Sequence, residues 1–186
     1  MDTLSYVALG GNIPSIAGSP GDSLTSALCR LEELGFSLVA VSRFWRTPAV
    51  PEGSGPDYVN ACCKMRSGLQ FDEILATLHK VESEFGRQRD ARWASRGLDL
   101  DLLAVEERVC PDLDTWTRWR NLPIESQMRE APEELILPHP RLQDRGFVLI
   151  PLADIAPLWR HPVSGMSVME MLAALPEAEK AAIEPL

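Results

Sequence analysis

The order in which strand-like and helix-like segments follow one another constrains this chain more than any other feature of its sequence. Residues 4–9 form a short apolar run followed by Gly10, a pattern typical of a strand that enters a turn. A helix is predicted to begin at Ser19, because Ser-Pro-Gly-Asp forms a capping box, and apolar residues recur at helical spacing up to Gly35. Residues 36–45 are rich in β-forming side chains and apolar on both faces, which predicts an interior strand.

The second half of the chain repeats this order without repeating the sequence. Strands are predicted over residues 58–65 and 98–105, with an amphipathic helix over residues 71–85 between them. Strand–helix–strand followed by strand–helix–strand is the order of a ferredoxin-like βαββαβ core. The predicted fold class is therefore α+β, with an antiparallel sheet, two helices on one of its faces and a C-terminal extension.

We expect a single domain over residues 1–186, with the rest of the chain arranged around this core. Residues 106–134 are polar and read as an excursion from it. A short final helix is predicted to begin at Ser167, which forms a capping box with Glu170. Residues 176–186 are expected to be a frayed tail.

Composition narrows the class of partner and the compartment. The net charge of −9 argues against binding to nucleic acid, because the phosphates would be repelled at long range. The chain has no apolar run of membrane-spanning length and no secretory pattern at its first residues, so we expect no membrane association and a cytoplasmic location. The four cysteines form no CxxC pair, and we interpret them as small buried side chains in a reducing compartment.

Two carboxylates interrupt the last apolar strand of the core. Asp99 and Asp101 are two residues apart, so they share one face of the strand, about 6–7 Å apart along the chain. Carboxylates held this close repel each other, and a divalent cation removes the repulsion. Magnesium accepts one or two carboxylates together with phosphate oxygens. A solvated polar face on an amphipathic strand is the alternative for this pair taken alone.

An arginine cluster lies just upstream of the aspartates in a chain that is otherwise acidic. Its members are Arg87, Arg89, Arg92 and Arg96. Guanidinium groups match phosphate oxygens, and arginine together with a metal ion neutralises a phosphoryl group during transfer. The cluster alone is also compatible with a solvated charged loop, but arginines leading into paired aspartates favour a phosphate site with metal. Because the chain has no Walker A and no GxGxxG pattern, such a site is neither a P-loop nor a Rossmann crevice.

Four further polar or aromatic residues stand where a purely structural reading leaves a choice. Glu82 falls in the apolar stripe of its helix, so it either lies at the edge in water or meets an arginine or a ligand. Tyr58 and Asn60 share a strand face, which suits a flat heterocycle but also suits core packing beside a capped turn. His139, between two prolines in a basic loop, either donates to a phosphate or satisfies a loop carbonyl.

Together these residues resemble one family, the 6-hydroxymethyl-7,8-dihydropterin pyrophosphokinases of folate biosynthesis, over about residues 4–175. The most specific match is the run Arg92-Trp93-Ala94-Ser95-Arg96-Gly97-Leu98-Asp99-Leu100-Asp101-Leu102-Leu103. Supporting matches, in the order of the family, lie at residues 8–12, 44–48, 56–61, 82–87 and 138–147.

The resemblance implies a ferredoxin-like enzyme that uses magnesium to transfer the β,γ-pyrophosphoryl group of ATP to the pterin hydroxymethyl oxygen, with release of AMP. It implies two magnesium ions on Asp99 and Asp101, with Arg87 and Arg96 as further catalytic groups. Its partners are then ATP and a reduced hydroxymethyl pterin, and we expect a monomer, with a dimer as the alternative. The residues implied for the ATP side are Glu82, Arg89, Arg92, Leu102, His139 and Arg145.

The resemblance also implies a pterin site. Tyr58 and Phe147 sandwich the ring, Asn60 and the backbone near Thr47 and Val50 read its edge, and Trp93 closes over it.

The chain departs from the family pattern in three places. The loop between Arg89 and Trp93 is one residue shorter than in the best-known members, and residues 110–131 resemble an insertion without a known role. Glu134 and Ile136 stand where some members offer an arginine and a threonine to ATP.

Two other classes of protein are rivals to this assignment. One is a noncatalytic ferredoxin-like regulator that binds a nucleotide or metal, and the other is a nucleotide-sugar transferase that uses its DxD for the metal.

Overall fold

The computed structural model describes residues 2–49, 53, 55–86, 96–123, 126, 130, 132 and 134–186. Its strands are β1 (Thr3–Gly11), β2 (Ser37–Val41), β3 (Trp45–Thr47), β4 (Tyr58–Ser67), β5 (Asp99–Val105) and β6 (Glu184–Pro185). Its helices are α1 (Pro20–Glu33), α2 (Phe71–Glu84), α3 (Leu113–Arg120), the 3-10 turn η1 (Leu142–Asp144), α5 (Gly146–Ile155), α6 (Val168–Ala174) and α7 (Glu177–Ala181).

The described strands form one antiparallel sheet. Its order is β5-β1-β4-β3-β6, and β2 pairs with β4 beside β3. The first and third strands of the predicted core are neighbours at the centre of the sheet, as the ferredoxin-like order requires. The predicted fold class is therefore confirmed, and the capping boxes predicted at Ser19 and Ser167 are both present.

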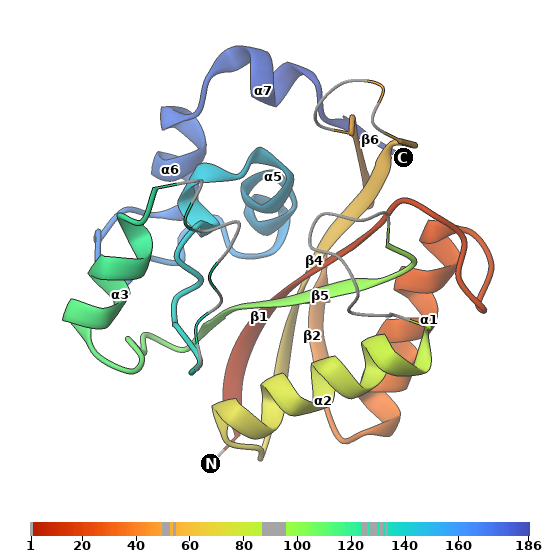
Figure 1. Ribbon diagram of the computed structural model, residues 1–186, viewed down its shortest axis with the longest axis horizontal. Helices are drawn as coiled ribbons and strands as arrows, with labels where there is room; N and C mark the ends of the chain where they lie inside the picture. Colours follow the sequence, from red (N-terminus) through yellow and green to blue (C-terminus); the bar gives the residue numbers. More distant parts are fainter. Residues whose placement is uncertain are drawn as a thin grey trace.

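Helices cover both faces of this sheet (Figure 1). The apolar stripes of α1 and α2 pack on one face with side chains such as Val7, Met65 and Leu100. On the other face α5 and α6 build a second core with Leu103 and Leu142. Two helices were predicted for the first face, and the extension after β5 supplies the layer on the second face. Among the described helices, none combines the length and apolar character that a membrane crossing requires.

The strand predicted over residues 36–45 is not an interior strand, and this expectation was wrong. It is divided into β2 and β3, and Ser42 stands at the break, where its hydroxyl accepts a hydrogen bond from the Cys62 backbone N–H at 2.9 Å. β2 pairs with β4 alone within the described sheet, so it is an edge strand. Val39 and Val41 are consequently 45% and 39% exposed. Apolar residues on both faces of a short segment do not by themselves report burial.

Two other expectations are corrected. Residues 176–186, expected to be a frayed tail, form α7 and then β6, which pairs with β3, and Ile183 is buried. The cysteines are not all buried side chains, because Cys29 is exposed on α1 while Cys62 and Cys63 are fully buried. The predicted excursion contains α3, and its two ends meet where Cys110 and Leu137 pair through their backbones.

Candidate active site

The register of the sheet brings residues from three strands into one row. Gly10 at the end of β1 pairs with Asp99 at the start of β5 and with Asn60 near the start of β4. A Cβ on Gly10, at the centre of this row, would lie 2.8 Å from the Asn60 Oδ1, so any larger residue there would displace the Asn60 side chain. The carboxylate strand β5 and the strand of Tyr58 and Asn60, β4, therefore flank β1, and their site residues lie at the same end of the three strands.

Asp99 and Asp101 share one face of β5, as their spacing predicts. Leu98, Leu100 and Leu102 turn toward the core under α1 and α2, so the aspartates face the opposite side. Both carboxylates are partly exposed, and each lies beside a guanidinium group. The Arg96 Nη1 is 2.8 Å from the Asp99 Oδ2, and the Arg145 Nη1 is 3.5 Å from the Asp101 Oδ2.

This donor set fits magnesium. Two partly exposed carboxylates on one strand face offer hard oxygen ligands and leave the remaining coordination positions to substrate phosphate and water. The two guanidinium groups show that the carboxylates attract positive charge in the protein alone. A bound cation would take over that role.

Glu82 does not lie in water at the edge of its helix, which was one of the two environments expected for it. Its side chain is only 1% exposed, and its Oε1 accepts a hydrogen bond of 2.8 Å from the Leu100 backbone N–H. This N–H points away from β1, and because β5 lies at the edge of the described sheet, no described strand lies on that side to accept its hydrogen bond. Glu82 thus holds the strand at the residue between the two aspartates.

The residues implied for the pterin lie on adjoining elements. Asn60 is buried, and its Nδ2 donates a hydrogen bond of 2.9 Å to the Thr47 Oγ1, which ties β4 to β3. Tyr58 begins β4 and is partly exposed, and α5, which carries Phe147 in its first turn, packs against β4. Phe147 remains 36% exposed, and the Arg145 guanidinium lies 5.6 Å from the centroid of its ring.

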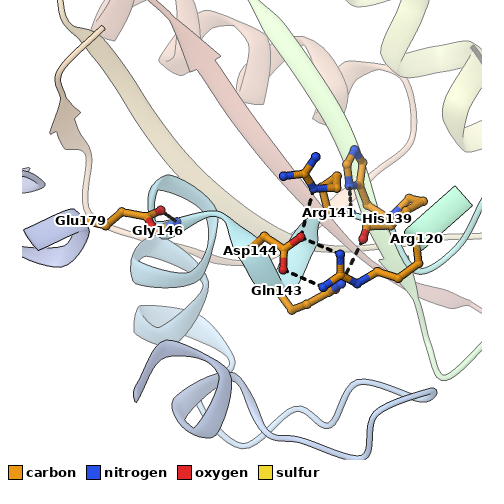
Figure 2. A network of polar contacts seen from close by, with 8 residues as sticks. Arg120, His139, Arg141, Gln143, Asp144, Gly146 and Glu179 are labelled. Atoms are coloured by element: carbon orange, nitrogen blue, oxygen red, sulfur yellow. Dashed lines mark hydrogen bonds and ion pairs between the residues drawn. The ribbon is translucent and has the colours of Figure 1, made fainter. Parts of the chain in front are cut away.

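His139 is held in a defined tautomer. Its backbone N–H donates to the Leu103 carbonyl of β5 at 2.7 Å, and its Nδ1 accepts from the Arg141 backbone N–H at 3.1 Å (Figure 2). The ring proton therefore lies on Nε2. Burial, and then the charge of Arg145, lowers the pKa of His139 to about 3. At neutral pH the ring is an uncharged donor.

The remaining site residues divide into two groups. The side chain of Leu102 lies in the core beneath the helices, so only its backbone is available to a nucleotide. Five of the predicted residues lie outside the described part of the chain, and their placement remains a prediction: Val50, Arg87, Arg89, Arg92 and Trp93.

Sequence reasoning gave no role to Asn12, which joins three segments around the row. The Asn12 Oδ1 accepts a hydrogen bond of 2.9 Å from the Arg96 backbone N–H, and the Asn12 backbone N–H donates one of 2.9 Å to the Arg96 carbonyl. The Asn12 Nδ2 donates a third, of 3.2 Å, to the Pro56 carbonyl. Arg96 is thereby held through its backbone as well as through Asp99. The only sequence signal was an amide directly after two glycines at a strand end.

On this ferredoxin-like sheet, a carboxylate pair beside arginines is an arrangement suited to an enzyme that transfers phosphoryl groups. The family model described as 7,8-dihydro-6-hydroxymethylpterin-pyrophosphokinase (HPPK) matches residues 6–157. The chain belongs to this family of pyrophosphokinases.

Individual relatives agree with this assignment. A 2-amino-4-hydroxy-6-hydroxymethyldihydropteridine pyrophosphokinase of Pseudomonas aeruginosa is 36% identical over 172 residues, which cover 92% of this chain and 91% of that protein. The enzyme of the same name from Synechocystis sp. is 35% identical over 169 residues, which cover 90% of this chain and 74% of that protein.

A solved structure, that of wild-type HPPK-DHPS from Plasmodium falciparum, superposes with a TM-score of 0.66 at 12% identity. The match covers 93% of this chain and 41% of that one. This chain therefore spans less than half of the fused protein, and at this identity the likeness supports the fold alone.

Proposed function

We propose that the chain transfers the β,γ-pyrophosphoryl group of ATP to the hydroxymethyl oxygen of 6-hydroxymethyl-7,8-dihydropterin, with release of AMP, as a step of folate biosynthesis. The family assignment supports this reaction. The observation that links the reaction to particular residues is the row through Asp99, Gly10 and Asn60, in which β1 alone separates the carboxylate strand from the strand of Tyr58.

In this proposal Asp99 and Asp101 hold two magnesium ions. Bound there, the metal supplies positive charge to the phosphate oxygens as the bond between the α- and β-phosphates breaks. Arg96 and Arg145 already lie against the carboxylates. With the carboxylate charge balanced by metal, Arg96 and Arg145 would be free to turn toward phosphate oxygens, for which the geometry of a guanidinium is suited.

The other described residues bind and orient the substrates. His139 offers a neutral Nε2–H to a phosphate oxygen, and its low pKa keeps it uncharged at neutral pH. The partly exposed rings of Tyr58 and Phe147 offer surfaces for the pterin, with the Asn60–Thr47 pair at its edge. Alignment of the hydroxymethyl oxygen with the β-phosphorus and neutralisation of charge are the two sources of rate acceleration.

A product assay tests the function directly. We expect AMP to appear from ATP only when both magnesium and the reduced hydroxymethyl pterin are present, with one pyrophosphorylated pterin formed per AMP. A noncatalytic regulator would bind ATP without forming AMP, and a nucleotide-sugar transferase would need no pterin. Either result, obtained with protein shown to bind ATP, would reject the proposed reaction.

The pterin contacts give a separate prediction. Phe147→Ala and Tyr58→Ala should weaken pterin binding by about 1–3 kcal/mol, because a stacked ring loses both buried area and the aromatic contact. Affinity for an ATP analogue should change little. Calorimetry with each ligand measures both effects, and Phe147→Leu is the control that keeps apolar area without a ring. Equal weakening of both ligands would show that the substitution has disturbed the site as a whole.

A further inference from the structure

The two ends of the excursion after β5 are joined by backbone hydrogen bonds between Cys110 and Leu137, a pairing called here the neck of the excursion. The Cys110 N–H donates to the Leu137 carbonyl at 2.9 Å, and the Leu137 N–H donates to the Cys110 carbonyl at 3.0 Å. The chain between them leaves the core and returns to the same place, directly before the basic loop of residues 138–145. Its helix α3 is capped by Asp112, whose Oδ1 accepts from the Thr115 N–H at 2.8 Å.

α3 contacts the basic loop near the first and the last residues of the loop. Trp116 is buried, and its Nε1 donates a hydrogen bond of 2.7 Å to the Pro138 carbonyl. One turn later, the two Nη atoms of Arg120 reach the two carboxylate oxygens of Asp144 at 2.8 and 2.9 Å (Figure 2). This paired arrangement fixes both the distance and the orientation of the two planar groups.

The contacted residues adjoin the groups that face the proposed ATP site. Pro138 precedes His139, and Asp144 precedes Arg145. Asp144 also accepts from the Arg141 Nε at 3.0 Å, so two arginines share its charge (Figure 2). The loop is therefore held by a helix of the excursion in addition to its own contacts with the core, such as that of the His139 N–H with β5.

We propose that α3 is a brace for the ATP side of the site, and that Arg120 is its positioning residue. The proposal rests on the proposed function. Arg120 acts through Asp144: it sets the direction in which the chain enters Arg145 and balances a carboxylate that otherwise competes with phosphate for Arg141 and Arg145. The brace gives the insertion at residues 110–131 a role in nucleotide binding.

The experiment compares ligand affinities of the full chain and its variants by calorimetry. One probe is α,β-methylene-ATP, used with magnesium; its methylene link between the α- and β-phosphates cannot be cleaved. The other probe is the reduced hydroxymethyl pterin. Arg120→Ala should weaken binding of the ATP analogue about tenfold, the scale of a lost hydrogen bond to a charged group. Pterin affinity should stay within about twofold, on the scale of a change of a few tenths of a kcal/mol.

Two variants separate positioning from charge and from general stability. Arg120→Lys keeps the charge that balances Asp144 but lacks the paired geometry, so it should recover only part of the affinity that Arg120→Ala loses. Arg118→Ala removes the same charge from an exposed position two residues away on α3, and it should bind both ligands as the unaltered chain does. In an Asp144→Asn background, Arg120→Ala should add less than about a twofold change, because the link is already cut.

The outcomes distinguish failure of the brace from failure of the proposed function. Full ATP-analogue affinity in Arg120→Ala, full recovery in Arg120→Lys, or equal weakening of ATP analogue and pterin would each overturn the brace. If the unaltered chain binds neither the ATP analogue nor the pterin, the proposed function fails instead.

Discussion

Replacing Asp99 or Asp101 by alanine is expected to lower turnover about a thousandfold or more, because each substitution removes a metal ligand whose charge stabilisation amounts to several kcal/mol. Single-turnover formation of AMP at millimolar magnesium measures the effect. The isosteric variants Asp99→Asn and Asp101→Asn should lose nearly as much, since an amide keeps the shape of the side chain but not the charge that holds the cation.

The same substitutions should leave the metal-free protein folded. Each carboxylate is partly exposed and has an arginine beside it, so its removal breaks a solvent-screened ion pair of the described residues. Such pairs contribute about 0–1 kcal/mol, and the free energy of unfolding in EDTA should change by no more than that. Activity within tenfold of the unaltered enzyme would contradict the metal assignment. Loss of the folded state would instead show that the aspartates are structural.

Local signals in the sequence were sufficient for the elements that carry the site. The capping boxes at Ser19 and Ser167 involve residues three apart, and both form as predicted. The shared face of Asp99 and Asp101 follows from the two-residue period of a strand, which holds wherever the strand lies in the sheet. These features depend on neighbours in the chain, and neighbours can be read from sequence.

Features that depend on distant partners could not be read in this way. Whether β2 lies inside the sheet or at its edge is decided by which strands pair with it, and the apolar pattern of residues 36–45 is compatible with both. The sequence left Glu82 either in water or beside an arginine or a ligand, and it gave no sign that its carboxylate binds a backbone N–H of β5, an edge strand of the described sheet. The Arg120–Asp144 pair joins residues whose proximity arises from the closed neck of the excursion.

Arg96→Ala is expected to have the second-largest effect. In the proposed function its guanidinium turns to the phosphates, from a backbone position that Asn12 holds through both the N–H and the carbonyl of Arg96. Removal of one preorganised donor of this kind costs about 10²–10³ in the rate of the chemical step. Affinity for the ATP analogue should fall much less, because the contact is strongest in the reacting complex. Single-turnover kinetics beside equilibrium binding separates the two quantities.

The ion pair with Asp99 adds an effect of opposite sign that is independent of turnover. In the metal-free protein the Arg96 Nη1 lies 2.8 Å from the Asp99 Oδ2, where it competes with a cation for the same carboxylate. Arg96→Ala should therefore raise the affinity for Mn²⁺ in the absence of nucleotide, by about two- to fivefold for a partly exposed pair. Titration of Mn²⁺ followed by electron paramagnetic resonance measures it, with Arg96→Lys as the control that keeps a competing charge. If Mn²⁺ binds more weakly to Arg96→Ala than to the unaltered chain, Arg96 supports the metal site and does not exchange with the metal.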